Sequence, residues 1–405
     1  MTISVSTDVP AAVVPNGKAP QGTAGSSTVP HGTVPTSTVP NGTVPNGTVQ
    51  YVNIGSLELE AGGFLPDVTL AYETWGTLNE DGSNAILVQH ALTGDTHVTR
   101  GGAGTEEGWW EQLAGPGAPA DTDRFFVISI NILGGCYGST GPSSTAPDGK
   151  PWGSRFPLVT LRDSTAAEAR LADRLGISSW HAVVGGSMGG ARALEWAVTF
   201  PERVRRCGVI SVGARSTAEQ IAFAQAQTLA IRQDRHFNGG DYYGGPEPAD
   251  GLALARRIAH ITYRSAYELD FRFGRNAQAA EQPLQADALA GRGRYQVESY
   301  LDHQGNKLVR RFDANSYIAL TEALMSHDVT RGRGTLKETL ARTTADFFVA
   351  AVESDRLYFP AQSQELAESL PGTVDVHMID SPIGHDGFLT EIGQLNAQLR
   401  AHLLN

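Results

Sequence analysis

The sequence predicts an α/β fold, with a mostly parallel sheet covered by helices on both faces and interrupted by an inserted helical segment. Three observations support this prediction. Short apolar runs alternate with helix-like segments between residues 85 and 213, and the alternation resumes after residue 343. The stretch between them is mostly helical in pattern. Strands that alternate with helices are typical of a parallel sheet.

Each predicted element rests on its own pattern. Six apolar runs of strand length are interpreted as strands: 85–90, 124–133, 181–186, 205–213, 345–355 and 373–380. Helical patterns cover 166–176, the residues after Gly190, 364–370 and 388–404. The core is therefore predicted from 51–213 and 343–405, with 214–342 as a helical lid.

Within the predicted lid, two further patterns indicate helices. Residues 251–273 and 313–329 are both amphipathic. The run Ser216-Thr217-Ala218-Glu219 fits a capping box, in which a side chain at each end of the box bonds a backbone amide, and it predicts the start of another helix.

Residues 1–50 differ in composition from everything that follows. The segment "VPHGTVPTSTVPNGTVPNGTV" repeats every five residues, and the first 50 residues contain no aromatic side chain. Such a stretch buries too little apolar surface to offset the entropy of ordering, so we predict a disordered tail. A partner-binding repeat or an elastic spacer is the alternative interpretation.

Composition and charge exclude several classes of partner. The net charge of −12 argues against a nucleic acid or an anionic membrane as partner, because both require a basic face. No apolar run approaches the roughly 20 residues that span a bilayer, and the N-terminus lacks the pattern of a secretory signal. Cys136 and Cys207 are the only cysteines, which fits a reducing, cytoplasmic location.

The stretch Gly185-Gly186-Ser187-Met188-Gly189 is the first candidate for chemistry. It fits G-x-S-x-G and lies between a predicted strand and a predicted helix. A sharp strand-to-helix turn of this kind leaves the serine exposed as a nucleophile, and glycines are needed where a β-carbon would clash. An inert serine in a glycine-rich turn is the alternative.

A serine nucleophile needs a histidine base and an acid to orient that histidine. Asp355 and His385 each follow a predicted strand, and functional groups of parallel sheets gather at such strand ends. The order Ser187, Asp355, His385 is the order of an α/β-hydrolase fold. Four other candidates fit the base and acid roles less well: Asp380, His327, His90 and His97. We interpret His90 and His97 as lining the substrate site.

An oxyanion hole would complete this machinery. The backbone amide of Met188 is one predicted donor, and the amide of Leu92, in the loop after strand 85–90, is the other. The histidines lack zinc-like spacing, and no dinucleotide or phosphate-loop motif occurs, so no metal and no cofactor are expected.

Six motifs together resemble one family, the homoserine O-acetyltransferases. They are "QHALTGDTH", "NILGGCYGSTGPSS", "VVGGSMGGARALEW", "GLALARRIAHITYRS", "RFDANSYIALTEALMSHD" and "GHDGFL". The resemblance runs from about Tyr51 to the C-terminus. It implies an α/β-hydrolase fold and transfer of an acetyl group from acetyl-CoA, a co-substrate, to L-homoserine through an acyl-serine, as a step of methionine biosynthesis.

The resemblance also implies residue roles. Ser187, Asp355 and His385 match the family's triad, and Arg256 and Asp386 match its substrate residues. A guanidinium suits the carboxylate of a zwitterionic amino acid, and a carboxylate suits its ammonium group. The alternatives are a solvated helix arginine for Arg256 and a helix N-cap for Asp386.

Beyond single residues, the resemblance implies a homodimer formed through the lid. Two other functions remain open on the same scaffold. One is acyl transfer from succinyl-CoA, or to serine, and the other is plain ester hydrolysis. Cys136 is interpreted as a buried thiol with no catalytic role.

Overall fold

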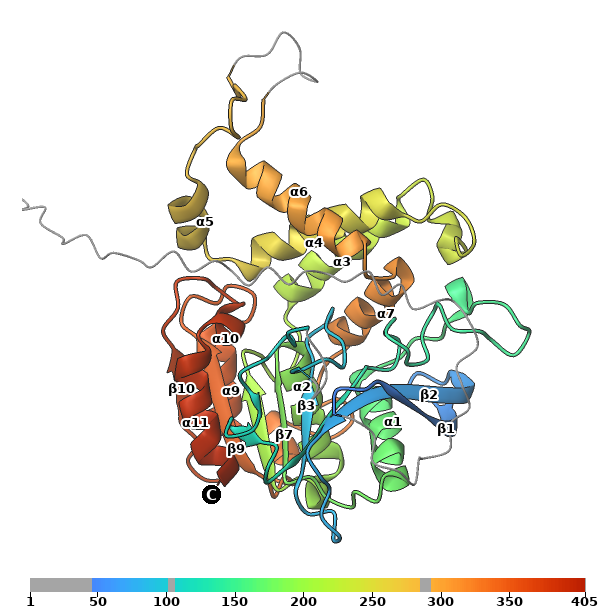
Figure 1. Ribbon diagram of the computed structural model, residues 1–405, viewed down its shortest axis with the longest axis vertical. Coiled ribbons are helices and arrows are strands. Elements are labelled where there is room, and N and C mark those ends of the chain that lie inside the picture. The colour runs from blue at the N-terminus through green and yellow to red at the C-terminus, as the bar shows by residue number, and fades with distance from the viewer. Residues whose placement is uncertain (1–45, 101–105, 285–292, 405) are drawn as a thin grey trace, which may run out of the picture.

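The computed structural model describes residues 46–100, 106–284 and 293–404, and an eight-stranded sheet lies at its centre (Figure 1). The strand order is β1-β2-β6-β3-β7-β8-β9-β10. From β6 to β10 neighbouring strands run parallel, whereas β1 and β2 are antiparallel. The strands are β1 (Gln50–Glu58), β2 (Phe64–Trp75), β3 (Ala85–Gln89), β6 (Phe126–Ile130), β7 (Ala182–Gly186), β8 (Arg206–Ile210), β9 (Asp346–Val352) and β10 (Val376–Ile379).

This architecture confirms the predicted α/β fold, and all six predicted strands are present within a few residues. The sequence interpretation missed the hairpin of β1 and β2, as well as a small pair of strands, β4 (Ala114–Gly115) and β5 (Ala120–Asp121). Most of the predicted disordered tail, residues 1–45, lies outside the described residues. At its other end the prediction was wrong, because Gln50 pairs with Tyr72 in the sheet.

Two apolar clusters cover the two faces of the sheet, as the alternation of side chains along a strand requires. In β3, Leu87 belongs to one cluster, while Ile86 and Val88 belong to the other. The first cluster includes side chains of α1 (Leu161–Arg174), α2 (Met188–Thr199) and α9 (Pro360–Ser369). The second includes α11 (Ile392–Leu404). Helices therefore flank both faces of the core.

The segment between β8 and β9 is helical, as predicted. It contains α3 (Ala218–Arg232), α4 (Ala249–Tyr263), α5 (Ala266–Phe273), α6 (Gln296–Val309), α7 (Ala314–Met325) and α8 (Leu336–Leu340). Figure 1 shows α3 to α6 grouped above the sheet, with α7 between this group and the core. We call residues 214–342 the lid.

Three local predictions differ from the structure. Thr217 rather than Ser216 caps α3, and Gln220 completes the box. Ser216 is engaged elsewhere, since its hydroxyl donates to the Leu324 carbonyl at 2.6 Å. The predicted helix 388–404 is two helices, α10 (Gly387–Thr390) and α11.

The predicted helix 251–273 is also broken, into α4 and α5, at the Arg264–Ser265 junction. Ser265 starts α5 by accepting a bond from the Glu268 amide, and its own amide donates to the Ile383 carbonyl at 2.9 Å. Gly384 packs so closely here that a β-carbon would lie 2.6 Å from the Ser265 nitrogen. The break therefore joins the lid to the loop that precedes His385.

The two ends of the lid lie side by side. The Ser216 amide donates to the His327 carbonyl at 2.9 Å, and the Val329 amide donates to the Ala214 carbonyl at 3.0 Å. The lid thus leaves and re-enters the core through one short antiparallel ribbon.

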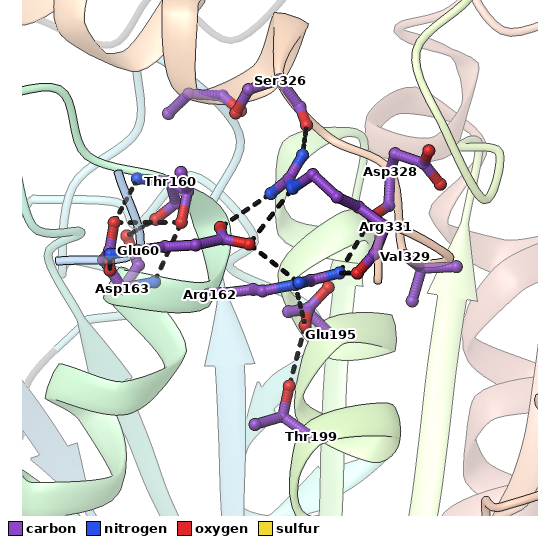
Figure 2. A network of polar contacts seen from close by, with 12 residues as sticks. Glu60, Thr160, Arg162, Asp163, Glu195, Thr199, Ser326, Asp328, Val329 and Arg331 are labelled. Atoms are coloured by element: carbon purple, nitrogen blue, oxygen red, sulfur yellow. Dashed lines mark hydrogen bonds and ion pairs between the residues drawn. The ribbon is translucent and has the colours of Figure 1, made fainter. Parts of the chain in front are cut away.

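A polar network attaches this ribbon to the core (Figure 2). Glu60, next to β1, accepts from Arg331 at 2.7 Å and from Arg162 of α1 at 2.8 Å. Glu195 of α2 pairs with Arg162 at 3.3 Å and with Arg333 at 2.7 Å. Glu195 is almost fully buried, so its pairs with Arg162 and Arg333 are screened by solvent less than the more exposed pair of Glu60 with Arg331.

In the part of the chain that the structure describes, no helix is long and apolar enough to cross a membrane.

Candidate active site

Ser187 lies at a strained turn between β7 and α2. Its φ is 56° and its ψ is −128°, a conformation that non-glycine residues rarely adopt. The Ser187 amide donates to the Ile210 carbonyl at 2.9 Å, which ties the turn to β8. The residue is 9% exposed, so it lies within the fold yet keeps access to the exterior.

The glycines around Ser187 are required by close approach. A β-carbon on Gly189 would lie 2.1 Å from the Gln89 carbonyl oxygen, and one on Gly186 would lie 2.3 Å from the Phe388 ring. Neither clash can be relieved by rotating a flexible side chain, because the first is with backbone and the second with a buried ring. The predicted reason for the glycines, a turn too tight for a β-carbon, therefore matches the packing.

Asp355 and His385 meet at the ends of neighbouring strands. The Nδ1 atom of His385 lies 2.7 Å from Oδ2 of Asp355, and both residues are buried. The other Asp355 oxygen accepts from the amides of Leu357 at 2.8 Å and Tyr358 at 2.9 Å. With both oxygens occupied, the carboxylate has one orientation and directs the imidazole.

Opposing influences act on the pKa of His385. Burial alone would lower the pKa of His385, but the charge and hydrogen bond of Asp355, with the charge of Asp386, raise it above 6.5. Its Nε2 atom is buried and has no hydrogen-bond partner among the described residues. A free, buried Nε2 is the atom that a general base needs.

Phe388 places His385 beside the serine turn. Its ring centroid lies 5.5 Å from that of His385, and the same ring is the surface against which Gly186 packs. The serine turn, through Gly186, and His385 thus both contact one buried aromatic ring. In this structure Ser187 is not hydrogen bonded to His385 Nε2, as is common before substrate binds.

The two predicted oxyanion donors are both unoccupied amides. Among the described residues, neither Leu92 nor Met188 donates its amide to another group. Met188 is the first residue of α2, where such amides are free to bind negative charge.

The loop that contains Leu92 is fixed by a histidine that the sequence interpretation placed wrongly. His90 is fully buried and does not line a substrate site. Its Nε2 accepts from the Ile132 amide at 3.1 Å, and its Nδ1 lies 2.7 Å from the Ala91 carbonyl. Burial, with the nearby charge of Arg192, lowers the pKa of His90 to about 3, so it remains neutral and supports the loop.

Arg256 and Tyr263 form one side of the site. Arg256 of α4 lies over the Tyr263 ring, 5.4 Å from its centroid, and that ring lies 6.0 Å from the ring of His385. No carboxylate lies within ion-pairing distance of Arg256 in the described part of the chain, whereas Arg257 pairs with Asp302 at 3.0 Å. The two neighbouring arginines therefore differ in the structure, because Arg257 has a carboxylate partner and Arg256 has none among the described residues.

Tyr263 was not singled out in the sequence. It follows Arg256 by seven residues, which is two helical turns, so the two side chains share one face of α4. That spacing is the signal that could have found it.

Asp386 directly follows His385 in the chain. It occupies the N-cap position of α10 but makes no capping hydrogen bond. Its Oδ2 instead pairs with Arg264 at 3.3 Å, and Arg264 is the residue at which the lid helix breaks. The carboxylate is therefore turned toward the lid.

The competing candidates lie apart from this cluster. Asp380 makes backbone bonds with Gln394 and none with His385. Cys136 as a whole residue is partly exposed, but its thiol group is buried, as predicted. Burial raises the pKa of the thiol to about 12, so it stays protonated near neutral pH. His97 pairs with Glu73 at 2.9 Å.

The fold and this serine turn define a class, and comparison with known proteins agrees. Residues 84–392 match the family described as the alpha/beta hydrolase fold. The chain belongs to that class of protein.

Within the class, the chain belongs to the homoserine O-acetyltransferase family. It is 59% identical over 348 residues to the homoserine O-acetyltransferase of Thermobifida fusca (strain YX), covering 85% of this chain and 90% of that protein. It also resembles the crystal structure of homoserine O-acetyltransferase from Bacillus anthracis, with a TM-score of 0.82, 27% identity, and coverage of 88% and 98%.

The same architecture occurs in a hydrolase. An acetylester hydrolase from Corynebacterium glutamicum gives a TM-score of 0.75 and 31% identity, covering 89% of this chain and 97% of that one. The fold alone therefore does not distinguish transfer from hydrolysis.

The contact between Asp355 and His385 predicts a specific titration. Removing the carboxylate charge with Asp355→Asn should lower the pKa of His385, because the largest force that raises it is gone while burial remains. Resonances of labelled imidazole, followed by NMR against pH, measure this change. Asp380→Asn is the control, since Asp380 makes no contact with the ring. Equal shifts in both variants would contradict the pairing.

Proposed function

We propose that this enzyme transfers the acetyl group of acetyl-CoA to the hydroxyl of L-homoserine through an acyl-Ser187 intermediate. The observation that carries the proposal is the Asp355–His385 pair beside the Ser187 turn, in a chain of the homoserine O-acetyltransferase family. Acetyl-CoA acts as a co-substrate, and the reaction needs no metal or further cofactor.

The first half-reaction acylates the serine. His385 Nε2 takes the proton of Ser187 Oγ as that oxygen attacks the thioester carbonyl. The amides of Leu92 and Met188 stabilise the oxyanion. The carbon–sulfur bond then breaks, and the CoA thiolate leaves, taking the proton from the imidazolium.

The second half-reaction regenerates the serine. His385 Nε2 accepts the proton of the homoserine hydroxyl, whose oxygen attacks the ester carbonyl of acyl-Ser187. The bond between the acyl carbon and Ser187 Oγ then breaks, and Oγ takes the proton back from His385. This step releases O-acetyl-L-homoserine. This ping-pong sequence uses one base twice, as microscopic reversibility requires.

Arg256 and Asp386 are proposed to bind homoserine. The guanidinium of Arg256 lacks a carboxylate partner, and a substrate carboxylate would supply one. Asp386, adjacent to the base, would bind the ammonium group. Two anchor points orient the hydroxyl, and effective molarities of oriented groups reach about 10⁵–10⁸ M, far above that of water.

On the same family grounds we assign the reaction to methionine biosynthesis in the cytoplasm. Cys136 and Cys207 are both free thiols, which is consistent with a reducing compartment.

We also propose a homodimer formed through the lid. Apolar side chains gather on the outer surfaces of α3, α4 and α5. Tyr267 and Phe271 are 65% and 68% exposed and stack on each other, with ring centroids 6.0 Å apart. Leu229, Leu254 and Ile261 are exposed nearby in the lid. A surface of this kind in a protein of the class is typical of an interface between copies.

The dimer is tested by sedimentation equilibrium of the full chain. We expect a dimer at micromolar concentration, and Leu254→Glu should shift it toward monomer, because a carboxylate would be buried without a partner. Phe64→Glu, an equally drastic change on the core, is the control. A monomeric wild type would contradict the proposal.

Measurement of CoA release tests the reaction itself. Release should require both acetyl-CoA and homoserine, and Ser187→Ala should reduce it more than about 10³-fold by removing the nucleophile. Succinyl-CoA replaces acetyl-CoA in a parallel assay. A preference for succinyl-CoA would change the donor, and release indifferent to homoserine would identify an esterase.

Arg256→Ala separates the two half-reactions. We expect the KM for homoserine to rise by roughly 10- to 100-fold through loss of a charged hydrogen bond, while the burst of CoA without acceptor stays within about twofold. Arg257→Ala, whose side chain pairs with Asp302, is the matched control. Equal loss of both half-reactions would refute the assigned role of Arg256.

A further inference from the structure

A group of cations near the site lacks the carboxylate partners that most lid arginines have. Arg232, Arg264, Arg272 and Arg294 each pair with an acidic side chain within 4.0 Å. Among the described residues, Arg256, Lys307 and Arg311 have none at that distance. An anion bound among these three residues would supply the negative charge that no described carboxylate provides at that distance.

The group extends outward from the predicted oxyanion loop. The Nη1 atom of Arg311 donates to the Thr93 carbonyl at 2.7 Å and to the Tyr137 hydroxyl at 2.7 Å. Thr93 follows Leu92 directly, so Arg311 touches the loop that would hold the thioester oxygen. The positive charge therefore begins beside the reacting carbonyl and continues into the lid.

Lys307 continues the group away from the nucleophile. It precedes Arg311 by four residues, near the end of α6, where side chains at that spacing are neighbours. The turn after α6 keeps this relation, since the Arg311 amide donates to the Leu308 carbonyl at 2.9 Å. Helix α4 packs against α6 at Gly305, where a β-carbon would lie 2.9 Å from the Ala253 carbonyl oxygen. That packing brings Arg256 of α4 to the same side.

The charges of these residues act on one another. Partial burial, and then the charges of Arg311 and Arg256, lower the pKa of Lys307 from 10.5. The charge of Arg311 also acts on Asp95, whose pKa burial raises. Like charges in proximity repel, so an anion bound between them would be stabilised.

We propose that Lys307, supported by Arg311, binds the phosphate groups of the acyl donor. This inference rests on the proposed use of acetyl-CoA. A CoA thioester carries its phosphates at the far end of the pantetheine arm, so a phosphate site must lie outward from the nucleophile. Lys307 lies in the last turn of α6, four residues before Arg311, and in the described part of the chain its ammonium group makes no hydrogen bond or ion pair.

The chain offers a matched control on the same helix end. Arg310 is exposed, carries the same charge and lies three residues from Lys307. Among the described residues it forms no hydrogen bond or ion pair with the oxyanion loop, and its charge is not among those that shift the pKa of Lys307. A general loss of positive charge at this end of α6 would affect both residues, whereas a phosphate site would depend on Lys307.

Steady-state kinetics with three donors test the proposal. We expect Lys307→Gln to raise the KM for acetyl-CoA by roughly three- to tenfold, the range of one partly exposed charged contact. Arg310→Gln should change it by less than about twofold. With S-acetyl-N-acetylcysteamine, a thioester without phosphates, the effect of Lys307→Gln should disappear. Acetyl-dephospho-CoA distinguishes the ribose phosphate from the diphosphate as the group that Lys307 binds.

Three results would overturn the proposal, and each differs from failure of the proposed function. A rise in the KM for homoserine, with the KM for acetyl-CoA unchanged, would assign Lys307 to the acceptor. Equal effects of Lys307→Gln and Arg310→Gln would indicate a general effect of positive charge at this end of α6 and not a specific phosphate site. An equal effect with the phosphate-free thioester would indicate a structural role. If the wild type releases no CoA at all, the function itself fails, and binding of CoA by calorimetry then tests the site alone.

Discussion

The close approach of backbone to backbone at the β7–α2 turn is the constraint on which the rest of the site depends. Gly189 lies so near the Gln89 carbonyl that no side chain fits between them. This contact brings the start of α2 directly over the end of β3. The start of α2, with the amide of Met188, therefore lies beside the loop after β3 that contains Leu92. The predicted nucleophile and its predicted oxyanion donors thus depend on one packing requirement, which only glycine satisfies.

A buried ion pair between α2 and α1 stabilises that packing. Arg192 of α2 pairs with Glu168 of α1, and both side chains are almost wholly buried. Glu168 also accepts from Gln89 at 2.7 Å and from Trp196 at 2.6 Å. The pair therefore joins β3, α1 and α2 at the base of the serine turn. Loss of one partner would leave an uncompensated buried charge, which costs about 3–5 kcal/mol, so the arrangement resists distortion.

The core could be predicted from the sequence because its signals are local. Apolar runs of strand length and the G-x-S-x-G turn each occupy a few consecutive residues, and topology then places Asp355 and His385 at strand ends. The hairpin of β1 and β2 has a weaker pattern and was missed. The break at Ser265 was also missed, because its cause is a bond to Ile383, far away in the sequence. Whether His90 lines a site or supports a loop depends likewise on a distant amide, that of Ile132.

In the proposed function, the lid accounts for transfer by a triad that could equally serve hydrolysis. A serine, a histidine and an aspartate in this geometry hydrolyse esters equally well, and the likeness to an acetylester hydrolase shows that the scaffold permits it. What differs is the acceptor's position. The lid is joined to the core at its paired ends by the Glu60 and Glu195 network, and at its middle by the contact of Ser265 with the His385 loop. These two attachments fix α4, so that Arg256 contacts Tyr263 and Arg264 pairs with Asp386, the residue after His385. In the proposed function, an amino acid bound by Arg256 and Asp386 has its hydroxyl oriented, whereas water has no such anchor. We therefore attribute the proposed selectivity for the acceptor to the attachment of the lid and not to any change in the proposed triad.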